Sequence, residues 1–95
     1  MPNFLVAHIR RQNVDLVLVP LEGDFEHYPR EEQAALLGEL RARAKAAGLR
    51  GTVVPVWAGE HEHMKFVAPR DLHPIFKGID VPWVRASINR ELSWT

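Results

Sequence analysis

The stretch Val14-Asp15-Leu16-Val17-Leu18-Val19-Pro20 determines which fold this chain can adopt. Asp15 is the only polar residue before Pro20, so both faces of an extended strand over this stretch are apolar. A strand that is apolar on both faces is typical of a sheet covered on both sides. We therefore expect residues 14–20 to lie inside a sheet that carries helices.

A second strand is predicted just before this one. Residues 4–9 form a short apolar run, and the polar segment 10–13 (Arg-Arg-Gln-Asn) separates it from residues 14–20. Two apolar runs joined by a few turn-forming residues predict a β-hairpin.

A long helix is predicted over residues 29–47. Pro29 suits its first position, and leucines and alanines recur at helical spacing behind it. Gly48 is expected to end the helix in a left-handed conformation, with Leu49 folding back on Ala44.

Two further strands and a short helix follow. Residues 52–58 (Thr-Val-Val-Pro-Val-Trp-Ala) predict a third strand, and residues 64–68 a fourth. Because Pro55 has no N–H to donate, we expect the third strand at a sheet edge, or irregular at that point. Asp71 is expected to cap a short helix that Gly78 ends.

The segment 80–94 fits two structures. As a helix, it has Asp80 as a cap and an apolar stripe of Val84, Ile88 and Leu92. As a strand, it has an apolar face too, but the polar residues 89–91 suit a strand poorly. We favour the helix and keep the strand as the alternative.

The order of elements predicts a single α+β domain over residues 1–95. The order is ββαββα, followed by a helix or a strand, which gives a small mixed sheet with helices packed on it. The strands before and after the long helix are expected to be parallel, with a right-handed crossover. If the tail is a strand, the last six elements follow the βαββαβ order of a ferredoxin-like topology.

Composition excludes several classes of protein. The 95 residues include 12 basic and 12 acidic ones, so the formal charge is zero, and a polyanion-coating protein is excluded. With 46% apolar and 25% charged residues, the chain has the composition of a globular domain. No cysteine is present, which excludes disulfides and thiol catalysis. With no apolar stretch near the ~18 residues of a membrane span and no signal-peptide core, we expect a cytoplasmic protein without a membrane partner.

Two segments of the chain resemble each other. Residues 19–27 and 54–63 each have Val-Pro, a short gap, and then Gly-acid-x-Glu-His. Both follow strands predicted to be parallel, so both segments are expected at the same edge of the sheet. Imidazole and carboxylate together suit a divalent metal such as zinc. The candidate ligands are His27, His61, His63, Asp24 and Glu26. The alternative is a pair of ordinary polar turns without a cofactor.

Basic residues suggest a nucleic-acid interface. Arg10 and Arg11 are adjacent in the first predicted turn, while Arg41, Lys45 and further cations surround the end of the long helix. Such a cluster can neutralise phosphates. Against this, cations late in a helix also complement its dipole, and the total charge is zero.

The tryptophans suggest an interface between protein chains. Trp83 and Trp94 do not both fit one apolar stripe of the tail, and tryptophan is enriched at interfaces. We therefore expect a homodimer that buries both rings; the alternative is that they fold onto their own sheet.

The sequence contains neither a nucleophile elbow nor a glycine-rich phosphate loop. The leading hypothesis is therefore a non-enzymatic, self-associating binding or regulatory module. Such a module can also have an unidentified protein partner.

Overall fold

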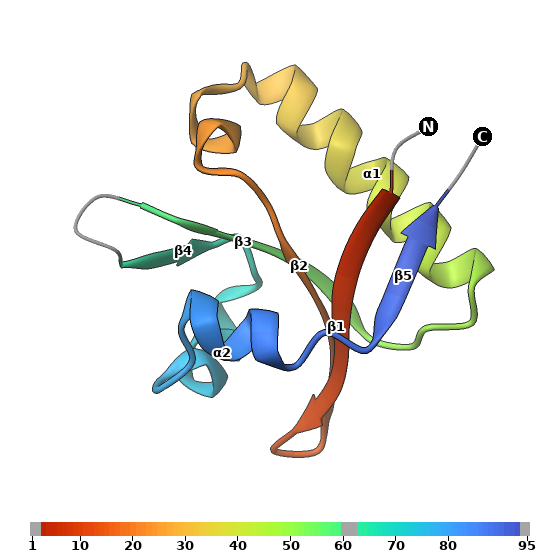
Figure 1. Ribbon diagram of the computed structural model, residues 1–95, viewed down its shortest axis with the longest axis vertical. Helices are drawn as coiled ribbons and strands as arrows, with labels where there is room; N and C mark the ends of the chain where they lie inside the picture. Colours follow the sequence, from red (N-terminus) through yellow and green to blue (C-terminus); the bar gives the residue numbers. More distant parts are fainter. Residues whose placement is uncertain (1–2, 60–62, 94–95) are drawn as a thin grey trace.

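The computed structural model describes residues 3–59 and 63–93. Over these residues, the strands form one five-stranded mixed sheet in the order β4-β3-β2-β1-β5 (Figure 1). The predicted α+β class is confirmed. The elements, in chain order, are β1 (Asn3–Arg11), β2 (Val14–Pro20), the 3₁₀ helix η1 (Gly23–His27), α1 (Arg30–Ala46), β3 (Thr52–Ala58), β4 (Met64–Phe66), the 3₁₀ helix η3 (Arg70–Phe76), α2 (Val81–Ala86) and β5 (Arg90–Ser93).

Strand β2 lies at the centre of the sheet, as its sequence predicts. Residues 16–19 are fully buried, and β2 pairs with the parallel strand β3 on one side and the antiparallel strand β1 on the other. Alternate side chains of β2 enter different cores. Val17 and Val19 pack with Leu40 of α1, while Leu16 and Leu18 pack with residues of η3 and α2. Helix α1 therefore covers one face of the sheet, and η3 and α2 cover the other (Figure 1).

The β1–β2 hairpin turns more tightly than its sequence suggests. Strand β1 continues to Arg11, and only Gln12 and Asn13 form the turn. Both turn residues have positive φ, 51° and 65°, which is the conformation that two-residue hairpins require and that asparagine tolerates. The prediction of a four-residue turn was wrong: Arg10 belongs to β1 and faces Asp15 across the ladder.

Helix α1 agrees with its prediction to within one residue at each end. Pro29 is the N-cap rather than the first helical residue. Gly48 has a φ of +77°, and the Leu49 N–H donates to the Ala44 carbonyl at 2.9 Å. This is the predicted left-handed ending, in which glycine meets no steric penalty from a Cβ.

Strand β3 is not an edge strand, so the expectation drawn from Pro55 was wrong. It pairs with β2 from Thr52 to Val56 and with β4 from Val56 onward. The Pro55 carbonyl accepts a bond from Val67, just after β4 ends at Phe66. The Pro55 ring nitrogen faces the β4 side of β3, as the Pro55 carbonyl does. At this position β4 has already ended, so proline is tolerated within an inner strand.

The tail is half helix and half strand, so the favoured continuous helix was wrong. Helix α2 ends at Ala86, and β5 pairs antiparallel with the first part of β1. Leu92 is 2% exposed and lies in the α1-side core. Pairing with an open strand and burial of Leu92 outweigh the low strand propensity of the polar residues around it.

The ferredoxin-like topology is not confirmed. In a split βαβ unit another strand separates the two parallel strands, whereas β2 and β3 are direct neighbours here. The short helix after β4 is present as η3, but its N-cap is Pro69 rather than Asp71. Among the described residues, no helix has the length and apolarity needed to cross a membrane.

Candidate functional site

An open groove lies where α1 ends and β3 begins. Its volume is about 630 Å³, and its described lining includes no acidic residue. Small residues form part of its surface, which leaves room for a ligand. The lining residues are Arg41, Ala44, Lys45, Gly48, Leu49, Arg50, Gly51, Thr52 and Val53.

Three cations line this basic groove. Arg41 and Lys45 are four residues apart on α1, so they share one face of the helix, and Arg50 follows two residues after the Gly48 ending. In the described part of the chain, none of the three forms an ion pair. By contrast, the Arg43 Nε lies 3.7 Å from a Glu39 carboxylate oxygen. The charges of the groove are therefore available to an anion.

The loop that carries Arg50 rests on the sheet. The His8 Nε2 lies within hydrogen-bond distance of the Arg50 carbonyl, at 2.9 Å. Gly51, at a φ of +120°, packs so closely on Asp15 that any side chain there would collide with the Asp15 backbone. Arg10 lies beside the groove at this point, because its Nε is 4.0 Å from the carboxylate of Asp15, on which Gly51 packs; the Arg10 side chain is 67% exposed.

Arg11 lies on the opposite face of the sheet. Its guanidinium stacks over the Trp83 ring, 5.6 Å from the centroid, and Trp83 packs on the core formed by α2 and η3. Successive side chains of a strand point to opposite faces, which separates Arg11 from Arg10. The structure thus brings Arg10, Arg41 and Lys45 to one side, and places Arg11 on the other.

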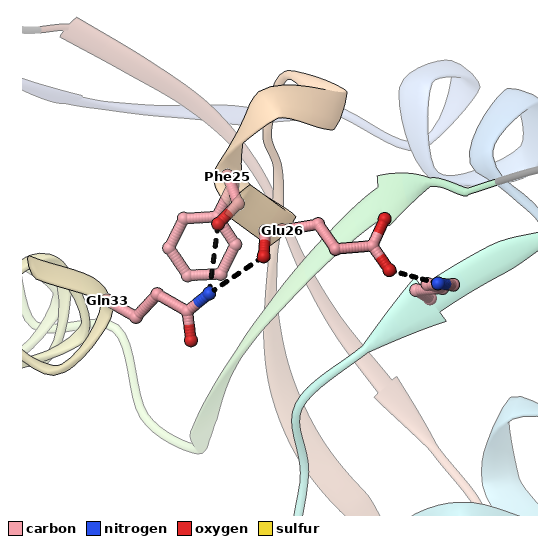
Figure 2. Close-up of polar contacts among 4 residues, drawn as sticks. Phe25, Glu26 and Gln33 are labelled. Atoms are coloured by element: carbon pink, nitrogen blue, oxygen red, sulfur yellow. Dashed lines mark hydrogen bonds and ion pairs between the residues drawn. The ribbon is translucent and has the colours of Figure 1, made fainter. Parts of the chain in front are cut away.

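A second polar arrangement holds η1 at the other end of the sheet. The Gln33 side-chain amide of α1 donates to the Phe25 carbonyl at 3.0 Å and to the Glu26 carbonyl at 3.4 Å (Figure 2). The Glu26 carboxylate points away from Gln33, toward β4 (Figure 2). There it forms an ion pair with the Lys65 ammonium. Helix α1 and strand β4 thus hold η1 from two sides.

The ion pair changes the titration of Glu26. The hydrogen bond from Lys65 holds the pKa of the Glu26 carboxyl below its ordinary value of 4.5, and the positive charge of Lys65 acts in the same direction. Desolvation opposes this lowering of the pKa, and the nearby His27 adds a smaller effect that lowers it further. Glu26 is therefore an anion whose charge Lys65 already compensates.

The predicted metal ligands are only partly described. Asp24, His27 and His63 are exposed, and Glu26 is ion-paired. His61 lies outside the described residues. In residues 3–59 and 63–93, no three His, Cys, Asp or Glu side chains converge as metal ligands do. Binding of zinc at this edge stays a prediction.

The two similar segments do come to the same end of the sheet. A side chain at Gly23 would lie 3.3 Å from the Ala58 carbonyl oxygen, and Glu26 contacts Lys65. The hairpin closes through a 2.8 Å bond from the Gly59 N–H to the His63 carbonyl. The first segment therefore touches the β3–β4 hairpin that carries the second.

Of the two tryptophans predicted to form an interface, the structure describes one. Trp83 is half-buried on its own chain, where the Arg11 guanidinium lies over its ring. Trp94 lies outside the described residues. Self-association through these two rings stays a prediction.

Sequence reasoning missed the residues that hold the loops in place. Gln33, Lys65 and Asn89 each bind a segment outside their own helix or strand, and none belongs to a recognisable motif. A polar residue at a half-buried helix position, such as Gln33, was the one available signal.

No protein-family model, curated protein or solved structure matches this chain. The fold class and the geometry of the groove are therefore the basis for a functional proposal.

Proposed function

We propose that this chain is a binding module rather than an enzyme, and that it binds single-stranded nucleic acid through the phosphate backbone in the basic groove. One observation carries the proposal: Arg41, Lys45 and Arg50 line one open groove whose described lining contains no acid. Arg10 adds a fourth cation beside it.

The neutral total charge does not oppose this function, because the charges are segregated. The first turn of α1 carries Glu31 and Glu32, and η1 before it carries Asp24 and Glu26. Toward the other end of the helix, Arg41 and Lys45 line the groove. An anionic strand is steered by the local potential rather than by the sum of all charges.

The lining of the groove favours contact with the phosphate backbone, without sequence preference. It combines cations with glycine and alanine and includes no aromatic ring among the described residues. Phosphate contacts position a nucleic acid without reading its bases. The groove is concave between α1 and the loop that rests on the β1–β2 hairpin, so a flexible strand fits it better than a rigid duplex.

Fluorescence anisotropy with a labelled 12-mer of mixed sequence tests the proposal. Four phosphate contacts predict that log K falls with log salt with a slope of about −3, from about −0.7 per phosphate on single strands. The double variant Arg41→Gln, Lys45→Gln should bind more than tenfold more weakly, with a slope smaller in magnitude by about 1.4.

Arg30→Gln is the matched control, because Arg30 is an exposed arginine at the opposite end of α1. It should bind the 12-mer within twofold of the parent. Binding that does not depend on salt, or an equal loss in the control and the double variant, would contradict a phosphate site in the groove.

A further inference from the structure

A small cavity lies at the end of the molecule opposite the basic groove, between η1, α1 and β1. Its volume is about 130 Å³, and its described lining contains no cation. Three aromatic rings and two carboxylates dominate that lining. The residues are Phe4, Leu21, Glu22, Asp24, Phe25, Tyr28 and Leu36.

The aromatic walls are partly fixed and partly open. Phe25 is 2% exposed, whereas Tyr28 is 39% exposed. Their rings meet edge to face, with centroids 5.7 Å apart and an interplanar angle of 67°. Phe25 makes a similar contact with the buried Trp57, at 5.1 Å. One wall is thus anchored in the core, while the other borders solvent.

The segment that carries these rings is held in place before any ligand arrives. Gln33 binds the carbonyls of Phe25 and Glu26, and the Glu26–Lys65 ion pair ties η1 to β4 (Figure 2). A site that is already ordered loses little conformational entropy when it binds. The cavity therefore does not have to be assembled by its ligand.

The charge around the cavity is negative. Glu22 and Asp24 are exposed lining residues, and none of the ion pairs found in the described residues involves them. Glu26, by contrast, is neutralised by Lys65 and points away. Aromatic faces also attract cations through the negative potential of their ring quadrupoles. Both features select a positively charged group.

We propose that this cavity binds a methylated ammonium group, such as the trimethylammonium head of choline or of trimethyllysine. At about 30 Å³ per water, the cavity has the volume of roughly four waters, and a trimethylammonium head has four non-hydrogen atoms. A bare ammonium is strongly hydrated and would leave most of the cavity unfilled. The methylated cation is weakly hydrated and places its methyl groups against the rings.

This site is independent of the proposed nucleic-acid groove. The groove is lined by the last turns of α1, whereas the cavity is lined by residues up to Leu36 in its first half. Failure of either proposal leaves the other intact.

Two-dimensional NMR titration of the full chain with choline chloride, at constant chloride, tests the site. We expect saturable shifts concentrated in residues 22–28 and at Leu36. A trimethyllysine peptide and the same peptide with unmodified lysine form a second arm. The ligand that binds more tightly, choline or the methylated peptide, identifies the source of the methylated ammonium group. The unmodified peptide should bind at least tenfold more weakly than its methylated form.

Variants and a neutral analogue separate the contributions of charge and rings. Tyr28→Ala should weaken choline binding at least tenfold, and Asp24→Asn several-fold, with Asp71→Asn, an exposed acid of η3, as the unchanged control. The uncharged isostere 3,3-dimethylbutanol should bind at least tenfold more weakly than choline. The proposal is overturned if neither ligand gives saturable shifts, if the isostere binds as well as choline, or if both Tyr28→Ala and Asp24→Asn bind like the parent. Should Tyr28→Ala not fold, Asp24→Asn and the isostere decide.

Discussion

Asn89 binds His8 through both ends of its side-chain amide. The His8 N–H donates to the Asn89 Oδ1 at 2.8 Å, and the Asn89 Nδ2 donates to the His8 carbonyl at 2.9 Å. The Asn89 N–H also donates to the Val6 carbonyl at 3.0 Å. The side-chain amide of Asn89 therefore makes the two hydrogen bonds that a further residue of β5 would make with β1. It thereby keeps the backbone of His8 hydrogen-bonded beyond Val6, where the pairing of β1 with β5 ends.

Replacing Asn89 by alanine should expose that edge. Both backbone groups of His8 lose their partner, and we expect the free energy of unfolding to fall by about 1–2 kcal/mol. Urea denaturation measures the loss, and hydrogen exchange locates it at the His8 amide. Lys77→Gln, on the exposed residue after η3, should leave both measurements unchanged. A His8 amide that exchanges equally in the parent and Asn89→Ala would show that the amide does not protect the strand.

The Glu26–Lys65 pair predicts how stability changes in acid. Because the folded pKa of Glu26 lies below 4.5, this pair stabilises the fold fully above pH 4.5, and the contribution is lost as the pH falls through the folded pKa. In Lys65→Gln, the Glu26 pKa should rise toward 4.5, as measured by carboxyl carbon NMR. The destabilisation by Lys65→Gln should be largest at neutral pH and shrink in acid. A Glu26 pKa that does not move in Lys65→Gln would exclude the ion pair as its cause.

Two glycines should respond in opposite directions to alanine. Gly51 has a φ of +120° and no space for a Cβ beside Asp15, so Gly51→Ala should destabilise the fold by about 3 kcal/mol. At Gly38, on the exposed side of α1, no atom lies near a new Cβ. Gly38→Ala should therefore stabilise the helix by about 1 kcal/mol. Thermal denaturation of both variants measures the difference, and equal effects would contradict the packing of Gly51 on Asp15.

Sequence patterns predicted the elements whose signals are local. The uninterrupted apolar run gave the buried strand β2, and the glycine ending of α1 is present as predicted. Pro55 led to a wrong prediction because a residue without an N–H was expected at an unpaired sheet edge. An unpaired N–H position also occurs within the inner strand β3, because its neighbour β4 is only three residues long. The tail misled for a similar reason. Its strand forms because β1 offers a partner, which no property of the segment itself records.

The candidate surfaces were predicted to different degrees. The basic end of α1 was visible in the sequence because its cations are close together along the chain. Arg10 lies near these cations and Arg11 does not, because the two residues point to opposite faces of the sheet. The sequence did not indicate this, since both arginines were expected in a four-residue turn rather than in β1. The aromatic cavity was not predicted, since Phe4 and Tyr28 are far apart along the chain and line one cavity only in the folded structure.

Asp15 provides a sensitive test of the basic groove. Its carboxylate lies 4.0 Å from the Arg10 Nε, and its side chain is 40% exposed, so it would lie close to a phosphate bound by Arg10. Asp15→Asn preserves the shape of the side chain and removes its charge. At a separation of ~6 Å in water, a unit charge is worth about 0.7 kcal/mol, which predicts a threefold gain in affinity for the single-stranded 12-mer.

The gain should depend on salt, because screening weakens an exposed charge. Anisotropy titrations at 50 mM and 300 mM salt should show the threefold gain at the lower concentration and little at the higher one. Asp71→Asn removes one negative charge from η3 and should change affinity by much less, which separates a local effect from a change in net charge. Loss of the Arg10 contact itself lowers stability by no more than about 1 kcal/mol, so both variants should be folded in the assay. If Asp15→Asn and Asp71→Asn bind the 12-mer equally tightly, the nucleic acid does not pass beside Arg10.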